Sequence, residues 1–214
     1  NAPGTTTFGN SIGATRALLA LTTDADGTTT ASAGATTVIT TGDQTYKDPV
    51  TLAAGTTTFT GDKITFNNTV DGDVAGNGIL DFDIPVAGTI NFEGPVGNGA
   101  ALDRMNSDTQ GTININGGVV TTTGPQTYDT AVVLGANADL SSGSSITFNS
   151  TLDGPGALTV STGGTADLVF NDVVGVGTAA LASLDASANG NTINIIIANA
   201  PNDAIRTTGA QTYN

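Results

Sequence analysis

The chain of 214 residues carries a formal net charge of −14 and contains neither cysteine nor histidine. These absences exclude a disulfide framework, a thiolate metal site and any catalytic triad that needs a histidine base. An acidic chain repels nucleic acid and anionic membrane surfaces, and no apolar run approaches the roughly 20 residues of a membrane span. We therefore expect neither nucleic-acid binding nor membrane insertion.

Short segments with alternating apolar and polar residues recur along the whole chain, separated by glycine, asparagine and aspartate. Leu158-Thr159-Val160 is one example, and an alternation with a period of two predicts short β-strands. In most segments a threonine or asparagine precedes a large residue, and the large residues follow one another mostly at about 20–25 positions. These large residues are Phe8, Tyr46, Phe66, Phe92, Ile115, Tyr128, Phe148, Phe170, Ile195 and Tyr213.

A longer repeat is superimposed on these segments. The motif Gly-x-Gln-Thr-Tyr occurs at 42–46, at 124–128 (82 residues later) and at 209–213 (85 residues later). Self-similarity at a fixed period is typical of repeat architectures. We interpret residues 1–214 as one continuous segment with a partial repeat at 1–41, repeats at 42–123 and 124–208, and the start of another at 209–214.

The spacing of the large residues favours an all-β fold of the parallel β-helix (β-solenoid) type over tandem sandwiches or a closed barrel. A coil of roughly 20–25 residues has the circumference of three short strands, so about four coils would form each 82-residue repeat. Equivalent residues of successive coils would then stack about 4.8 Å apart. The ten large residues are accordingly predicted to form much of one internal ladder.

One alanine- and leucine-rich segment per repeat departs from the alternation: residues 14–21, 99–102 and 178–184. Its composition permits a helical turn or two. Leu181 and Leu184 can equally point inward from a coil, and we interpret the segment as a core-facing loop.

Paired aspartates are the nearest thing to a catalytic or metal-binding signal. Two stacked carboxylates about 5 Å apart could cleave a polysaccharide, and several carboxylate oxygens could hold Ca²⁺. Aspartate is, however, also favoured in turns, because its carboxylate accepts hydrogen bonds from nearby backbone N–H groups. We predict a turn role, no catalytic, cofactor-binding or metal residues and no enzymatic activity, with Ca²⁺ at the acidic turns as the weaker alternative. The pairs are Asp24 with Asp26, Asp71 with Asp73, and Asp81 with Asp83.

Two further patterns have structural explanations. Threonine runs at 5–7, 28–30, 56–58 and 121–123 could bind ice if they formed a regular lattice, but their separations are irregular, and strand propensity explains them. Asn67-Asn68-Thr69 and Asn149-Ser150-Thr151 match the glycosylation acceptor pattern, and we expect them at corners of the coils.

Residues 119–128 (VVTTTGPQTY) and 146–154 (ITFNSTLDG) resemble the repeats of giant bacterial surface proteins similar to the filamentous-haemagglutinin type of adhesin. The resemblance implies an exported, right-handed β-helical fibre at the bacterial cell surface. The expected function is a structural stalk or fibre segment used in adhesion or surface assembly, with further repeats of the same protein, or copies of itself end to end, as partners. A self-assembling filament or surface-layer subunit is the alternative, and a polysaccharide-acting β-helix enzyme is the third candidate. The export route and any host or cell-surface ligand stay open.

Overall fold

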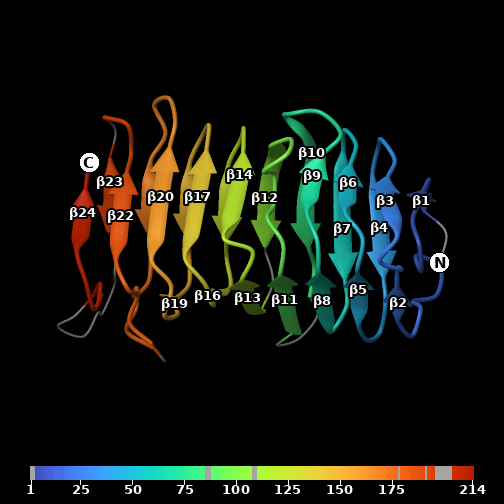
Figure 1. Ribbon diagram of the computed structural model, residues 1–214, viewed down its shortest axis with the longest axis horizontal. Coiled ribbons are helices and arrows are strands. Elements are labelled where there is room, and N and C mark those ends of the chain that lie inside the picture. The colour runs from blue at the N-terminus through green and yellow to red at the C-terminus, as the bar shows by residue number, and fades with distance from the viewer. Residues whose placement is uncertain (1–2, 85–87, 108–109, 178, 191, 196–203) are drawn as a thin grey trace.

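The computed structural model describes residues 3–84, 88–107, 110–177, 179–190, 192–195 and 204–214. Its strands are all parallel to their neighbours and stack as a β-solenoid whose coils lie roughly 22 residues apart. The strands follow one another along the long axis of the molecule from the N-terminal to the C-terminal end (Figure 1). The predicted all-β solenoid is therefore confirmed.

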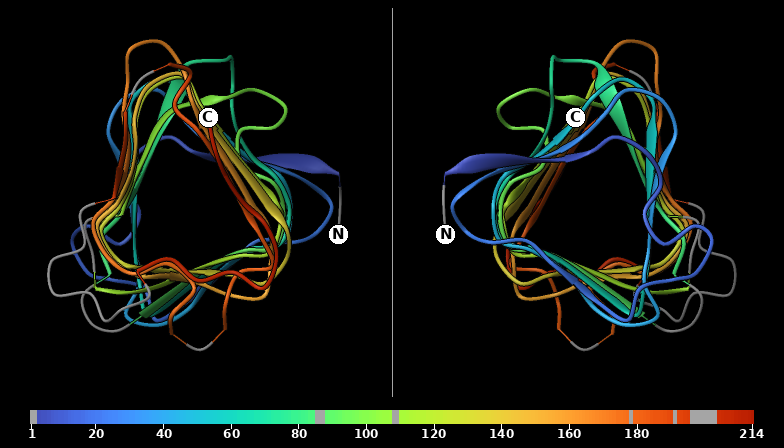
Figure 2. Two further views of the ribbon diagram at one scale, coloured as in Figure 1. Left: turned by 90° about the vertical axis from the view of Figure 1, so that its left-hand side faces the viewer. Right: turned by 90° about the vertical axis from the view of Figure 1, so that its right-hand side faces the viewer.

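Viewed along its axis, the solenoid is a triangle (Figure 2). We number its faces in the order in which the chain visits them. Face 1 contains β1 (Gly4–Phe8), β3 (Gly27–Ala31), β6 (Val50–Leu52), β9 (Val70–Gly72), β14 (Val119–Thr122), β17 (Ala138–Ser142), β20 (Leu158–Thr162), β22 (Leu184–Ser187) and β24 (Gln211–Tyr213). Val96 continues this face between β9 and β14, because it bridges both Val70 and Val120.

The other two faces are built in the same way. Face 2 contains β4 (Thr36–Ile39), β7 (Thr56–Thr60), β10 (Asn77–Phe82), β12 (Leu102–Ser107), β15 (Gln126–Tyr128), β18 (Ile146–Phe148), β21 (Leu168–Phe170) and β23 (Ile193–Ile195). Face 3 contains β2 (Leu21–Thr22), β5 (Gln44–Tyr46), β8 (Lys63–Phe66), β11 (Gly88–Phe92), β13 (Gly111–Ile115), β16 (Ala131–Leu134) and β19 (Leu152–Asp153). Single bridging residues extend faces 2 and 3: Ile12 on face 2, and Val174 and Ile205 on face 3.

The alternation in the sequence places one row of side chains inside the triangle and the next outside. In β18, for example, Ile146 and Phe148 are buried and Thr147 is half-buried on the outer surface. Eight of the ten predicted large residues are buried, whereas Ile195 and Tyr213 are exposed. The burial of apolar area is the main favourable term in such a core. The largest fully buried side chains are Tyr46, Phe59, Phe66, Phe82, Phe92, Tyr128, Phe148 and Phe170.

The prediction of one internal ladder needs a correction, although the predicted burial is confirmed for eight of its ten residues. Tyr46, Phe66, Phe92 and Ile115 pair in succession on face 3, whereas Tyr128, Phe148, Phe170 and Ile195 pair in succession on face 2. Phe8 and Tyr213 both lie on face 1. The ladder is divided because a repeat does not contain a whole number of coils, so equivalent residues of successive repeats lie on different faces.

The rings within each ladder are nearly parallel. Tyr128 and Phe148 have ring centroids 4.8 Å apart at an interplanar angle of 7°, and Phe148 and Phe170 have centroids 5.3 Å apart at 4°. On face 3 the same arrangement recurs, with centroids 5.0 Å apart for Tyr46 and Phe66 and 5.6 Å apart for Phe66 and Phe92. Phe59 and Phe82 on face 2 contact this second stack edge-on.

The described residues of the alanine- and leucine-rich segments form loops that lead into β2, β12 and β22, and the described part of the chain contains no helix. Leu102, Leu181 and Leu184 are buried in the core, as the core-facing interpretation predicts. Leu18, the counterpart of Leu102 and Leu181 in the first coil, is 39% exposed. Thr178 lies outside the described residues.

The threonine runs are only partly stacked. Thr5, Thr6 and Thr7 pair with Thr28, Thr29 and Thr30 on face 1, but residues 56–58 lie on face 2. The four runs therefore do not form one continuous array on one face, as their irregular spacing predicts.

Candidate functional site

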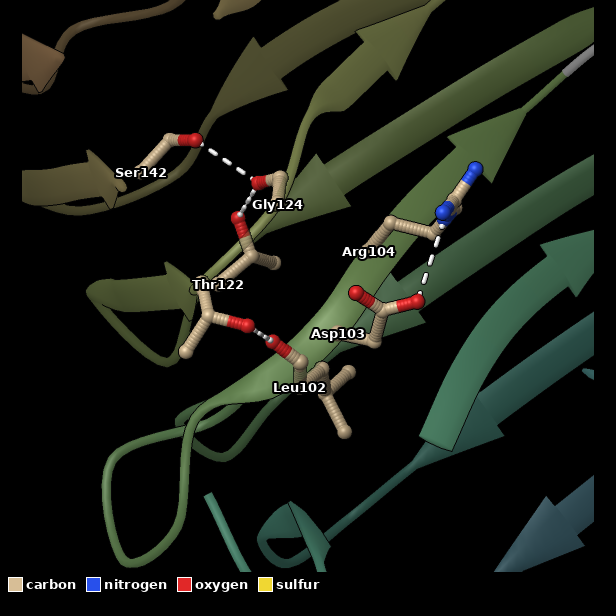
Figure 3. A network of polar contacts seen from close by, with 7 residues as sticks. Leu102, Asp103, Arg104, Thr122, Gly124 and Ser142 are labelled. Atoms are coloured by element: carbon tan, nitrogen blue, oxygen red, sulfur yellow. Dashed lines mark hydrogen bonds and ion pairs between the residues drawn. The ribbon is translucent and has the colours of Figure 1, made fainter. Parts of the chain in front are cut away.

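The repeated Gly-x-Gln-Thr-Tyr motif forms a corner of the triangle, and all three copies form it by the same contacts. A threonine two positions before the glycine donates its hydroxyl to the glycine carbonyl, at 2.6 Å from Thr40 to Gly42, 2.6 Å from Thr122 to Gly124 and 2.8 Å from Thr207 to Gly209. In the central copy Ser142 of the next coil donates to the same Gly124 carbonyl at 2.7 Å (Figure 3). The turn carbonyl, which the strand ladders leave unpaired, is thereby satisfied inside the protein.

The glutamine of the motif connects two coils. The Gln126 side-chain amide donates to the Val120 carbonyl at 3.2 Å in its own coil and to the Ser141 carbonyl at 2.8 Å in the next. Gln44 repeats this pattern with the carbonyls of Val38 at 3.0 Å and Thr60 at 2.8 Å. Both glutamines are fully buried, and a buried amide is tolerated because its hydrogen bonds are made.

The tyrosine completes the corner. The Tyr46 hydroxyl donates to Gln44 Oε1 at 2.8 Å, and the Tyr128 hydroxyl donates to Gln126 Oε1 at 2.9 Å. Burial raises the pKa of Tyr128, and burial together with the nearby Asp48 carboxylate raises the pKa of Tyr46. Both hydroxyls thus stay protonated and act as donors well above neutral pH.

The third copy of the motif lies in the last coil and is exposed. Tyr213 still donates to Gln211 Oε1 at 2.9 Å, but the Tyr213 side chain is 43% exposed, whereas Tyr46 and Tyr128 are 0% exposed. The difference arises because Phe66 and Phe148 of the next coils cover Tyr46 and Tyr128. The described chain places no coil over Tyr213.

In the structure Asp71 and Asp73, one of the aspartate pairs that the sequence suggested as a catalytic or Ca²⁺ site, have different hydrogen-bond partners. Asp71 Oδ1 accepts hydrogen bonds from the N–H groups of Gly99 at 2.8 Å and Ala100 at 3.4 Å, so its carboxylate holds the loop of a neighbouring coil. Asp73 Oδ1 accepts from its following N–H and from the Asn77 amide at 2.7 Å. The contacts of Asp73 agree with the predicted turn role, whereas Asp71 lies in β9 (Val70–Gly72) and holds a loop of the next coil instead.

The remaining acidic pairs occupy different settings. Asp81 accepts a hydrogen bond from the Thr58 hydroxyl at 3.0 Å on the outer side of face 2, while Asp83 is exposed beyond the end of β10. Asp24 and Asp26 are exposed in the loop before β3. Within the described ranges no group of three or more acidic residues is arranged to hold a metal ion, and Ca²⁺ at these turns stays a prediction.

Asp153 is a loop anchor that the sequence analysis did not single out as one. It lies 82 residues after Asp71, is 7% exposed, and accepts a hydrogen bond from the Gly177 N–H at 2.8 Å. The repeat itself contains the signal, because an aspartate at the same repeat position precedes a glycine-containing loop in both cases.

Asp48 is a second residue that the sequence did not indicate. Its side chain is 2% exposed, and its carboxylate accepts hydrogen bonds from Thr29 at 2.9 and 3.0 Å and from Thr23 at 2.5 Å. The equivalent residue of the next repeat is Thr130, whose buried hydroxyl donates to the Gly111 carbonyl. Asp48 and Thr130 are both small and polar at the same repeat position. This shared character is the signal in the sequence for a buried polar side chain at this corner.

The glycosylation-like asparagines lie at corners, as predicted. Asn67 and Asn149 are exposed directly after β8 and β18. The Asn149 amide donates to Asp129 of one neighbouring coil, and Asn149 Oδ1 accepts from the Asn171 amide of the other at 2.5 Å. Asn149 is therefore part of an outer polar ladder.

The described surface contains no pocket, and no helix in the described ranges is long and apolar enough to cross a membrane. No known protein family matches the chain, and neither a curated protein nor a solved structure shows significant similarity to it.

Proposed function

We propose that this chain is a structural segment of an extracellular stalk or fibre at a bacterial cell surface, used in adhesion or surface assembly. The observation that carries the proposal is the continuity of the solenoid along its axis. Each inner ladder passes from coil to coil, and parallel strand pairing links the coils from β1 to β24.

The proposed mechanism is mechanical. Hydrogen bonds between coils run along the axis, so each coil is a template for its neighbours and the array stays extended without disulfides. The buried glutamine of each repeat adds side-chain hydrogen bonds between coils, from Gln44 to Thr60 and from Gln126 to Ser141. The small share of charged residues is compatible with such a stack, because outward-facing threonine, serine and asparagine side chains keep the surface polar.

Immunogold labelling of intact cells tests this function. Antibodies raised against the folded 214-residue chain should label extended structures outside the cell envelope of the organism that encodes it. A parallel preparation of permeabilised cells is the control for access to the interior. Gold confined to the interior of permeabilised cells would refute the proposal.

A filament or surface-layer subunit is the second candidate, in which copies of the chain would continue the solenoid end to end. Tyr213 and Ile195 are 43% and 42% exposed at one end, and Leu18 and Leu19 are 39% and 83% exposed at the other. Unpaired strand edges with apolar side chains promote association. Sedimentation of the purified chain separates the two functions, because a subunit should form long polymers at neutral pH and a stalk segment should stay monomeric.

A further inference from the structure

Equivalent parts of successive repeats lie on different faces of the triangle. The Gln-Thr-Tyr strand is β5 on face 3, β15 on face 2 and β24 on face 1. The four-residue ladders follow the same order: Tyr46 to Ile115 lies on face 3 and Tyr128 to Ile195 on face 2. Phe8 and Ala31, which correspond to the last two rungs, pair on face 1.

The number of sides in a repeat explains this rotation. The repeat that starts at β5 has eleven sides, namely β5, β6, β7, β8, β9, β10, β11, the side at Val96, β12, β13 and β14, and β15 starts the next repeat. The repeat that starts at β15 also has eleven sides, namely β15, β16, β17, β18, β19, β20, β21, the side at Val174, β22, β23 and the side at Ile205, and β24 starts the next. Eleven sides are three coils and two thirds, which refines the expected value of about four. Each repeat is therefore turned by one third of a circle relative to the last.

The protruding loops rotate in the same way. Each begins at a glycine of positive φ, Gly13 at 75°, Gly97 at 67° and Gly175 at 68°, where a Cβ would collide with a carbonyl of the next coil. The loops end where Leu18 bridges Thr40, Leu102 bridges Thr122 and Leu181 bridges Thr207.

These bridges place each loop at a different corner. The loop after Gly13 lies between faces 2 and 3, the loop after Gly97 between faces 1 and 2, and the loop after Gly175 between faces 3 and 1. The view along the axis shows loops leaving the triangle in different directions (Figure 2).

The same corner contacts form after each rotation, so a repeat can start on any of the three faces. The N–H groups of Thr41, Thr123 and Thr208 donate to the carbonyls of Leu18, Leu102 and Leu181 at 2.7, 2.8 and 2.8 Å. A unit that makes the same contacts at every corner can be added indefinitely with the same one-third turn.

We propose that the repeat is a one-third-turn screw unit, which distributes the aromatic ladders evenly over the three faces and presents one loop per repeat in three directions. This inference rests on the proposed stalk function and adds its mechanical design. An array of such units has no face that consistently contains larger residues, so it is straight and equally stiff in every direction. Three repeats, or eleven coils, return each feature to its starting face.

A longer array tests the screw directly. Residues 42–123 are inserted repeatedly after position 123 of the full chain, and the array is examined by electron cryomicroscopy. By strand spacing, each inserted repeat should add about 18 Å of length with a rotation of one third of a turn. Repeats related by translation without rotation would overturn the proposal.

A matched array supplies the control. Duplicating residues 53–60, one corner and strand β7, within every inserted repeat gives twelve sides, or four whole coils. Its Gln-Thr-Tyr strands should then all lie on one face, and the rod should curve. A straight twelve-side rod as stiff as the eleven-side rod would refute the mechanical role. If the twelve-side array does not fold, the rotation measured on the unmodified period still decides the screw.

The two proposals can fail separately. A one-third turn in purified arrays with gold label only inside cells would refute the stalk and leave the screw. Surface labelling of an array without rotation would refute the screw and leave the stalk.

Discussion

At the scale of single residues, the solenoid depends on side chains that contact the coil above and the coil below. Phe148 shows this most clearly, since its ring lies between Tyr128 and Phe170 and is 1% exposed. A smaller side chain at this position would leave a cavity inside the core. The neighbouring residues could not move in to fill it, because strand pairing fixes them on both sides.

Replacing Phe148 with alanine should therefore lower the free energy of unfolding by about 3–5 kcal/mol, the usual range for a phenylalanine removed from a packed core. Chemical denaturation measures the change. Thr147→Ala, at the outward neighbour in the same strand, is the control and should cost less than about 1 kcal/mol. Equal effects of the two substitutions would contradict the inward placement of Phe148.

Gln126 and Gln211 offer a matched pair, because they occupy the same motif in a buried and an exposed coil. Gln126→Leu should destabilise the protein by about 1–3 kcal/mol, the usual cost of one buried polar group left unpaired. The group left without its partner is the Tyr128 hydroxyl, whereas the Val120 and Ser141 carbonyls lose a second hydrogen bond and stay within the paired strands β14 and β17. Gln211→Leu should have a much smaller effect in the same denaturation assay. A comparable loss from both would mean that the connection between coils is unimportant.

The buried tyrosines predict a loss of stability at alkaline pH. The pKa values of Tyr46 and Tyr128 are raised in the folded state, so above the ordinary tyrosine value of about 10 the unfolded chain loses protons that the folded chain keeps. The contribution of the two protonated tyrosines to the free energy of unfolding is fully present below pH 10. Above that pH the free energy of unfolding should fall by about 1.4 kcal/mol per pH unit for each tyrosine. Thermal unfolding between pH 9 and pH 12 measures this. The double variant Tyr46→Phe/Tyr128→Phe should be less stable at neutral pH and show a shallower alkaline slope; an unchanged slope would contradict the assignment.

At the scale of elements, the corners and loops decide how the chain passes from one face to the next. The strands are short, and the loop in each repeat is held by an aspartate of a neighbouring coil: Asp71 with Gly99, and Asp153 with Gly177. Because these carboxylates accept backbone N–H groups, they control the loop's path without contributing to the apolar core.

Asp153→Ala should therefore release the loop around Gly177 with a moderate loss of stability, about 1.5–3 kcal/mol for a hydrogen bond to a charged group. Hydrogen exchange followed by mass spectrometry should show faster exchange confined to this loop and its neighbours. Asp139→Ala, an exposed aspartate on the outer side of β17, is the control and should leave exchange unchanged. Unchanged exchange near Gly177 in Asp153→Ala would rule out the anchoring role.

At the scale of the whole molecule, the solenoid is a row of nearly equal units in which each coil is stabilised by its neighbours. Interior coils have a neighbour on both sides, and the end coils described here have one. Stability should accordingly decrease toward both ends, as in other repeat architectures.

The three Gln-Thr-Tyr strands allow this gradient to be measured on identical sequences. Amide exchange should be slowest in β15, which lies in the interior, and fastest in β24, the last strand. Equal protection of β15 and β24 in the dilute chain would instead indicate that the end is covered by another molecule. A concentration series would then confirm that interpretation if the protection of β24 increases with protein concentration.

Much of the architecture could be predicted without the structure. The period-two alternation around residues such as Phe148 and Leu158 is a local property, so it predicts which side chains face inward. The recurrence of large residues at about one coil's length predicts stacking. The sequence contains few charged residues and many threonines, and threonine is both polar and favoured in strands. This composition predicts strands with a polar outer surface. The turn role of Asp73, which accepts hydrogen bonds from Val74 and Asn77, also follows from local chemistry.

The tertiary structure decided what depends on the closure of the triangle. Whether Tyr128 lies above Tyr46 or on another face depends on the exact number of sides between them. A corner can contain few or many residues, so the spacing in the sequence does not reveal that number. The buried position of Asp48 likewise requires that Thr23 and Thr29, both from the preceding coil, come together at the corner between faces 3 and 1. The sequence by itself therefore determined the type of strand, the solenoid and the inward residues, because these follow from local periodicity. Only the folded chain determined the one-third turn of each repeat, because the rotation accumulates over all eleven sides.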